Sequence, residues 1–223
     1  MKNIPMIKAA ITLLALSTLG LANAQAQLLV DFDLNGYTNQ YPTYTPISTS
    51  TYGSTAANIG NSSIDLGDGA DVADATTATD RQVFTGFGAA NLADAITDDD
   101  YISFNVDAQS GFQFTVDEIF IQHRADSGST FSGVIRSSVD SYATDLATVS
   151  FSAGIDVNDT MSISGVTNQT SVEFRLYAWG DSTSNFQVRD LDVGGTVIPE
   201  PSTAGLLCAA MGLVLLVRRR RLC

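Results

Sequence analysis

The chain has 223 residues, with 11 basic and 24 acidic side chains and a formal net charge of -13. The basic residues gather at the two ends, so residues 27–198 keep five arginines and no lysine against 23 acidic residues, a balance of -18. Such a surface repels phosphate backbones and anionic lipid head groups, which argues against nucleic acid as a partner and for divalent cations.

The N-terminus, residues 1–26, is predicted to be a secretory signal peptide. Two lysines precede the apolar run 9–22, and small residues follow it. Ala24 and Ala26 each close a small-x-small motif, so cleavage is expected after one of them. An uncleaved membrane anchor is the alternative, but the apolar run is short for a membrane span.

The first predicted strand, 28–34, contains a partial calcium-loop motif. Asp31-Phe-Asp33-Leu-Asn35-Gly36 matches the first half of an EF-hand loop, but its twelfth position is Pro42, where that loop needs a bidentate glutamate. We therefore interpret the segment as a strand whose alternate apolar residues face the core, with an Asn-Gly turn after it.

Residues 37–100 are rich in Thr, Ser, Ala, Asp and Gly, which predicts long loops with short strands near 59–66 and 83–87 and one or two helical turns in 89–96. Four aspartates, Asp65, Asp68, Asp71 and Asp74, recur here every three residues. Carboxylates on loops suit Ca²⁺, so these four residues are candidate ligands of one structural calcium ion. The alternative is a set of solvated acidic loops that keep the protein soluble.

Two-residue alternation of apolar and polar residues dominates the rest of residues 28–198, and turn-forming Gly, Asp, Asn and Ser clusters separate the runs. After the first strand, the predicted strands are 101–106, 112–124, 131–139, 146–151, 161–163, 172–179 and 186–193. The length suits one domain, 27–198. The pattern predicts an all-β fold, an antiparallel β-sandwich with jelly-roll connectivity.

Catalytic groups are scarce in this domain. Its single histidine, His123, would have to serve any Ser-His-Asp arrangement, and no G-x-S-x-G motif presents a serine. Both cysteines, Cys208 and Cys223, lie near the C-terminus, so residues 27–198 offer no thiol nucleophile and no disulfide. We therefore expect a protein that is not an enzyme.

The predicted strand 172–179 carries the candidate ligand-binding residues. Alternation places Glu173, Arg175, Tyr177 and Trp179 on one face. Aromatic rings beside charged groups suit a sugar, because pyranose C–H faces stack on rings and hydroxyls take polar partners. Arg175, Tyr177 and Trp179 are therefore candidates for polysaccharide binding, and the alternative is a structural network of ion pairs across neighbouring strands.

The C-terminal segment 199–223 combines three ordered elements. Pro199, Glu200 and Pro201 form a Pro-Glu-Pro motif, an apolar run occupies 203–217, and four arginines follow, namely Arg218, Arg219, Arg220 and Arg221. The run predicts a short transmembrane helix, and the basic cluster after it is expected to stay in the cytoplasm with the main domain outside.

These elements closely resemble the PEP-CTERM sorting signal of Gram-negative bacteria. The resemblance implies recognition by an exosortase, a membrane enzyme thought to cleave near the motif and to release or transfer the protein at the cell surface. An ordinary C-terminal membrane anchor is the alternative, and the domain is exported in either case.

The domain itself has a weaker resemblance to the jelly-roll ectodomains often attached to this tail, which resemble carbohydrate-binding modules. The segments that carry it are 101–104, 123–124, 134–138, 173–177 and 190–194. The sequence thus predicts an exported protein of the cell surface, extracellular matrix or biofilm, held by the inner membrane before processing. The alternative is a carbohydrate-binding module for an extracellular polysaccharide.

Overall fold

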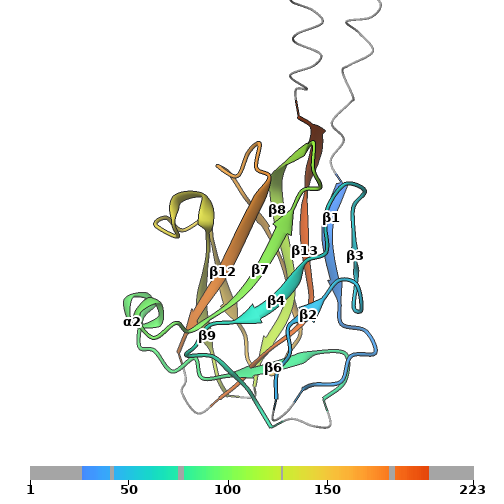
Figure 1. The fold of residues 1–223 in the computed structure, drawn as a ribbon. Coiled ribbons are helices and arrows are strands. Elements are labelled where there is room, and N and C mark those ends of the chain that lie inside the picture. The colour runs from blue at the N-terminus through green and yellow to red at the C-terminus, as the bar shows by residue number, and fades with distance from the viewer. Residues whose placement is uncertain (1–26, 41–42, 75–77, 127, 181–183, 201–223) are drawn as a thin grey trace, which may run out of the picture.

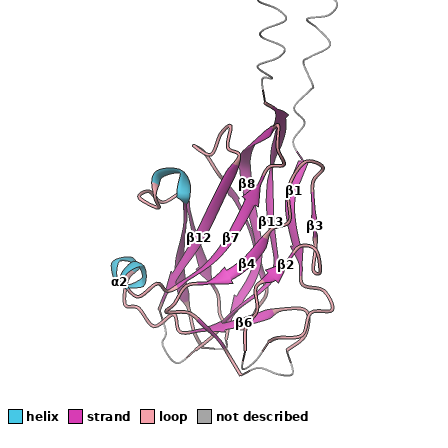
Figure 2. Ribbon diagram, viewed as in Figure 1, coloured by secondary structure: helices cyan, strands magenta, loops and turns pink. Residues whose placement is uncertain are grey.

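The computed structural model describes residues 27–40, 43–74, 78–126, 128–180 and 184–200. Two antiparallel sheets pack face to face, and strands account for most of the ribbon (Figure 2). The prediction of an all-β antiparallel sandwich is therefore confirmed. No helix within the described ranges is long and apolar enough to cross a membrane, and the apolar run 203–217 lies outside those ranges.

One sheet has seven strands, in the order β11-β8-β13-β1-β3, with β6 paired to β13 and β5 paired to β6. Its strands are β1 (Gln27–Asp33), β3 (Ser54–Thr55), β5 (Asp71–Val72), β6 (Gln82–Thr85), β8 (Phe112–Ala125), β11 (Val157–Ser162) and β13 (Phe186–Pro199). The two 14-residue strands β8 and β13 pair along their length and form its centre (Figure 1).

The other sheet has six strands, in the order β10-β9-β12-β7-β4-β2. They are β2 (Ile47–Ser48), β4 (Ser63–Leu66), β7 (Tyr101–Asp107), β9 (Phe131–Ser137), β10 (Ala147–Phe151) and β12 (Ser171–Trp179). Within the described ranges, the helical elements are α2 (Leu92–Thr97), capped by the Asn91 side chain, and the 3-10 turn η1 (Ser138–Asp140).

Alternating apolar residues of both sheets fill the core. On β12, Val172, Phe174 and Leu176 are buried, and Phe174 stacks on Phe104 of β7 at 5.3 Å between ring centroids. A register shift after Leu28 turns both Leu29 and Val30 inward. The sandwich thus uses period-2 patterning on one face of each strand and leaves the outer faces polar.

The EF-hand motif lies in a strand and turn, as interpreted from sequence. Asp31 and Asp33 belong to β1, the Asp33 carboxylate accepts a hydrogen bond from Asn35 N at 2.9 Å, and Gly36 takes a left-handed φ of 79°. A left-handed turn residue favours glycine. No calcium loop is needed to explain this segment.

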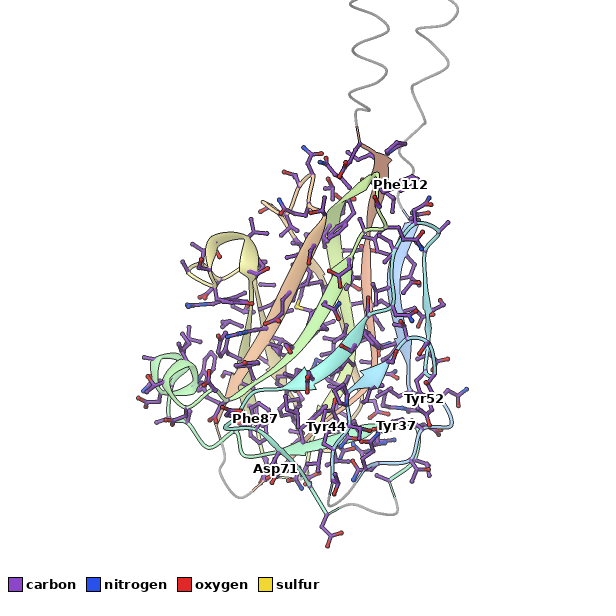
Figure 3. All side chains as sticks on the ribbon, in the orientation of Figure 1. Tyr37, Tyr44, Tyr52, Asp71, Phe87 and Phe112 are labelled. Carbon is purple, nitrogen blue, oxygen red and sulfur yellow. The ribbon has the colours of Figure 1, made fainter. Side chains whose placement is uncertain are left out.

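The last strand is longer than predicted. β13 continues beyond residue 193 and pairs Pro199 with Phe112, so the first residue of the Pro-Glu-Pro motif belongs to the sheet. A proline at the last strand position removes only a terminal ladder donor. Gln27 pairs with Gly195, so β1 begins and β13 ends at one pole, where Phe112 also lies (Figures 1 and 3).

Candidate functional site

The outer face of the six-stranded sheet carries the candidate site predicted from sequence. β12 lies between β9 and β7, with its apolar residues in the core and Glu173, Arg175 and Trp179 partly exposed on the opposite face. Arg136 of β9 lies directly opposite Arg175. Arg124 lies on β8 in the other sheet and does not line this face.

Tyr177 differs from the sequence prediction. It lies opposite Tyr101 of β7 and is only 3% exposed, with the edge of one ring against the other at 5.3 Å between centroids. A buried ring cannot stack on a sugar. Trp179 is half-buried at the end of β12, so the predicted Tyr177 and Trp179 pair does not form an exposed aromatic surface.

The guanidinium of Arg175 lies between two tyrosine rings. Its Cζ is 4.0 Å from the ring centroid of Tyr142 and 4.3 Å from that of Tyr101. Its Nε donates to Glu173 Oε1 at 2.8 Å. Cation–π contacts and a charge-assisted hydrogen bond together fix the orientation of Arg175.

Tyr142 reaches Arg175 from the connection between β9 and β10. Its hydroxyl donates to Glu173 Oε1 at 2.8 Å, and burial, followed by that hydrogen bond, raises the Tyr142 pKa to about 12. The hydroxyl therefore stays protonated in physiological conditions. Alternation does not reveal Tyr142, because it lies outside every strand, and its only sequence signal is an aromatic residue in a polar loop.

Next to this stack lies an open groove of about 300 Å³ across β4, β7 and β12. Its polar lining includes Ser63, Asp65, Ser103, Asn105, Asp107 and Glu173. Asn105 accepts from Ser63 N at 2.8 Å and donates to Asp107, which also accepts from Ser171 Oγ at 2.5 Å. The groove thus presents a preorganised row of carboxylates, an amide and hydroxyls.

The four predicted calcium ligands do not come together. Asp65 lies on β4 at the groove, whereas Asp71 lies on β5 at the pole opposite the chain ends (Figure 3). Asp68 and Asp74 are exposed in turns. These residues do not fit a shared calcium site, because antiparallel pairing sends β4 and β5 into different sheets.

A different group of carboxylates gathers on the outer face of the seven-stranded sheet. One oxygen from each of Asp31, Asp190 and Asp192 lies within 4.8 Å of the others, which is close enough to share a cation. Burial first, and then the charges of Asp190 and Asp31, raise the pKa of Asp192 to about 7. The sequence signal is an Asp-x-Asp pair on each of two strands, which becomes meaningful only when their register is known.

His123 is fully buried on β8, where its Nε2 lies 2.9 Å from Asp159 Oδ2 and its ring contacts Phe151. It lies in the core, away from the groove. Of the predicted sorting motif, Pro199 and Glu200 are described and exposed, and Glu200 N donates to Gly111 O at 2.9 Å. Pro201, Arg218–Arg221 and the predicted cleavage residues Ala24 and Ala26 lie outside the described residues.

No family model and no curated protein matches the chain. Among solved structures, a family 29 carbohydrate-binding module is 11% identical with a TM-score of 0.39, over 76% of this chain and 89% of that chain. A lysine-to-alanine mutant of such a module, complexed with cellulohexaose, is 10% identical with a TM-score of 0.40, over 77% and 93%. An aspartate-to-alanine mutant complexed with mannohexaose is 10% identical with a TM-score of 0.38, over 76% and 92%. These values are too low to assign the chain to that family.

Proposed function

We propose that residues 27–200 form a polysaccharide-binding module that is not an enzyme. The observation that carries this proposal is the juxtaposition, on one sheet face, of the polar groove with the stack of Tyr142, Arg175 and Tyr101. Sugars bind through hydroxyl hydrogen bonds to fixed polar groups and through C–H contacts with rings, and this face offers both.

The groove residues are held before any ligand arrives. Asn105, Asp107 and Ser171 are joined to one another by hydrogen bonds, and Glu173 is fixed by Arg175 and Tyr142. A preorganised polar surface loses less side-chain entropy on binding. The one histidine is buried elsewhere, which supports binding without catalysis.

We further propose that the module is exported and sorted through its PEP-CTERM signal by an exosortase-type enzyme, then displayed at the cell surface or in the extracellular matrix. The common pole of Gln27 and Pro199 supports this arrangement, because the domain then joins the predicted signal peptide and the predicted sorting tail at the same pole. We also propose that the strands of this sandwich are connected as in a jelly roll.

Structural calcium stays a prediction without assigned ligands, because the four expected aspartates are dispersed. A thermal melt of the domain in calcium and in chelator tests it. An unchanged melting temperature contradicts structural calcium.

Binding is tested with a glycan array probed with residues 27–200, which contain both sheets in full. The wild type is expected to bind at least one polysaccharide, and Asn105→Ala and Asp107→Ala to lose that signal. Gln122→Ala, on the outer face of the other sheet, is the matched control. The proposal fails if the folded wild type binds no polysaccharide.

A further inference from the structure

Resting on this proposed function, we infer that Tyr142 is the sugar-stacking residue of the site and that its ligand is an uncharged polysaccharide. Three observations support it: a disfavoured backbone at Tyr142, the placement of its ring, and the pairing of both nearby arginines.

The backbone at Tyr142 is held in an unusual conformation. Ser141 and Tyr142 both have a φ of 60°, in the left-handed region that bulky side chains avoid. Such conformations persist where the surroundings impose them, and they concentrate at binding sites. Two consecutive residues of this kind mark the loop as more than a simple connection between β9 and β10.

Polar contacts on both sides hold the loop. Tyr142 N donates to Ser137 O at 2.8 Å, and its carbonyl accepts from Arg136 Nη1 at 2.9 Å. Arg136 Nε also contacts Asp145 at 2.7 Å, while Asp140 accepts from Thr144 N at 3.0 Å. The loop is therefore preorganised, which keeps the Tyr142 ring in one position without a ligand.

Arg175 and Glu173 fix the position of the Tyr142 ring. Arg175 lies over one face, and the hydroxyl is fixed by Glu173, while the residue as a whole is only half-buried. Tyr177 is buried and Tyr101 is wedged between Arg175 and Tyr177, so neither competes for this role. The face of Tyr142 turned away from Arg175 is the one we assign to the sugar.

Charge on this sheet face selects the ligand class. Arg175 is paired with Glu173 and enclosed by two rings, and Arg136 is paired with Asp145 and the Tyr142 carbonyl. The groove itself contains Asp65 and Asp107, two of the 23 acidic residues that give the domain its balance of -18. Uronate or sulfate groups are repelled by this field, whereas neutral sugars offer hydroxyl donors to the carboxylates.

The test compares the binding of residues 27–200 to neutral polysaccharides, here glucan and mannan, and to the anionic polysaccharide alginate. Tyr142→Ala is expected to weaken neutral-glycan binding by about tenfold, the size of one ring contact. Tyr142→Phe keeps the ring and is expected to stay near wild-type affinity. Binding of the neutral glycan is expected to change little with salt.

The outcomes separate the two proposals. If the wild type binds no polysaccharide, the proposed function fails. If it binds a glycan but prefers alginate, or if a folded Tyr142→Ala binds as well as the wild type, the polysaccharide-binding function stands and the present inference is overturned. Should Tyr142→Ala unfold, loss of binding by the folded Tyr142→Phe overturns the stacking role, and retention supports it.

Discussion

Asp31 of β1 lies directly opposite Asp192 of β13, and the next pair on the same face sets Asp33 opposite Asp190. Like charges facing one another across strands destabilise a sheet. The Oδ1 atoms of Asp190 and Asp192 are buried and have no hydrogen-bond partner among the described residues. A local electrostatic cost is therefore built into the centre of the seven-stranded sheet.

The environment of Asp192 predicts that the stability of the domain depends on pH. Burial and neighbouring carboxylates raise the Asp192 pKa from 3.8 to about 7, so folding favours the protonated form. The stability that protonated Asp192 contributes to the folded state is fully present below about pH 4 and is lost as the pH rises through about 7. Asp192→Asn is expected to raise the free energy of unfolding by about 1–2 kcal/mol above that pH, after allowance for solvent screening of a half-buried group.

Urea unfolding at roughly pH 4 and pH 8 measures this effect. The stability difference between the two conditions should shrink in Asp192→Asn. The exposed Asp117→Asn on β8 serves as the control and should keep the wild-type dependence. Equal pH profiles for wild type and Asp192→Asn would show that Asp192 does not carry the dependence.

We expect Asp156 to contribute to the stability of the seven-stranded sheet. It contacts Arg189 at 2.9 Å, Arg81 at 3.5 Å and Arg124 at 3.8 Å. Burial first, and then the charge of Arg124, lower the pKa of Arg81, so these cations repel one another. Asp156→Ala is expected to cost about 1–2 kcal/mol because it leaves three neighbouring guanidinium groups without their shared carboxylate.

The measurement is again urea unfolding, at low and at high salt. Added salt should narrow the gap between Asp156→Ala and wild type, because it screens the repulsion. Asp74→Ala, an exposed aspartate in a turn, should have no effect. A salt-independent deficit would contradict an electrostatic cause.

We expect substitutions of His123 and Asp159 to have non-additive effects on the free energy of unfolding. Asp159 points inward from the edge strand β11, and its Oδ2 lies 2.9 Å from Nε2 of His123, a side chain with no exposed surface. An inward charge also discourages an edge strand from pairing with another chain. Asp159→Val alone is expected to cost about 1–3 kcal/mol, because it leaves the buried imidazole unsatisfied.

The double variant His123→Phe with Asp159→Val removes both polar partners and should be less destabilised than Asp159→Val alone. A thermodynamic cycle of the four proteins measures the coupling. If the effects of the two substitutions are strictly additive, the 2.9 Å contact contributes nothing to stability. Light scattering of the same variants reports whether the edge strand then associates.

The long strands could be predicted from sequence because each buries one face, and alternation marks such strands directly. β11 is longer than predicted: its first four residues, Val157–Thr160, lie at a sheet edge and alternate between half-buried and exposed, so no apolar pattern marks them. β6 pairs with β13 and β5 pairs with β6, and only the assembled sheet reveals these contacts.

Part of the candidate site could also be predicted from the sequence, and part could not. Glu173 and Arg175 share a face by alternation alone, so the sequence places them correctly. The burial of Tyr177 depends on the register that sets Tyr101 opposite it, and Tyr142 depends on the path of a loop. Register and loop geometry are long-range properties, and no local pattern encodes them.

The last prediction concerns the C-terminal boundary of the domain. Gly194 to Pro199 pair with β8, and Glu200 N donates to Gly111 O, so the folded unit includes the chain as far as Glu200. A protein ending at Glu200 should match the melting temperature of a longer one. A protein ending at Val193 should lose at least about 2 kcal/mol of stability with its ladder hydrogen bonds and buried residues.

Processing at the predicted sorting motif would then release the domain intact. The intact mass of protein recovered from cells should place the C-terminus near residues 199–201, and a mass that includes Arg218 to Cys223 would contradict processing.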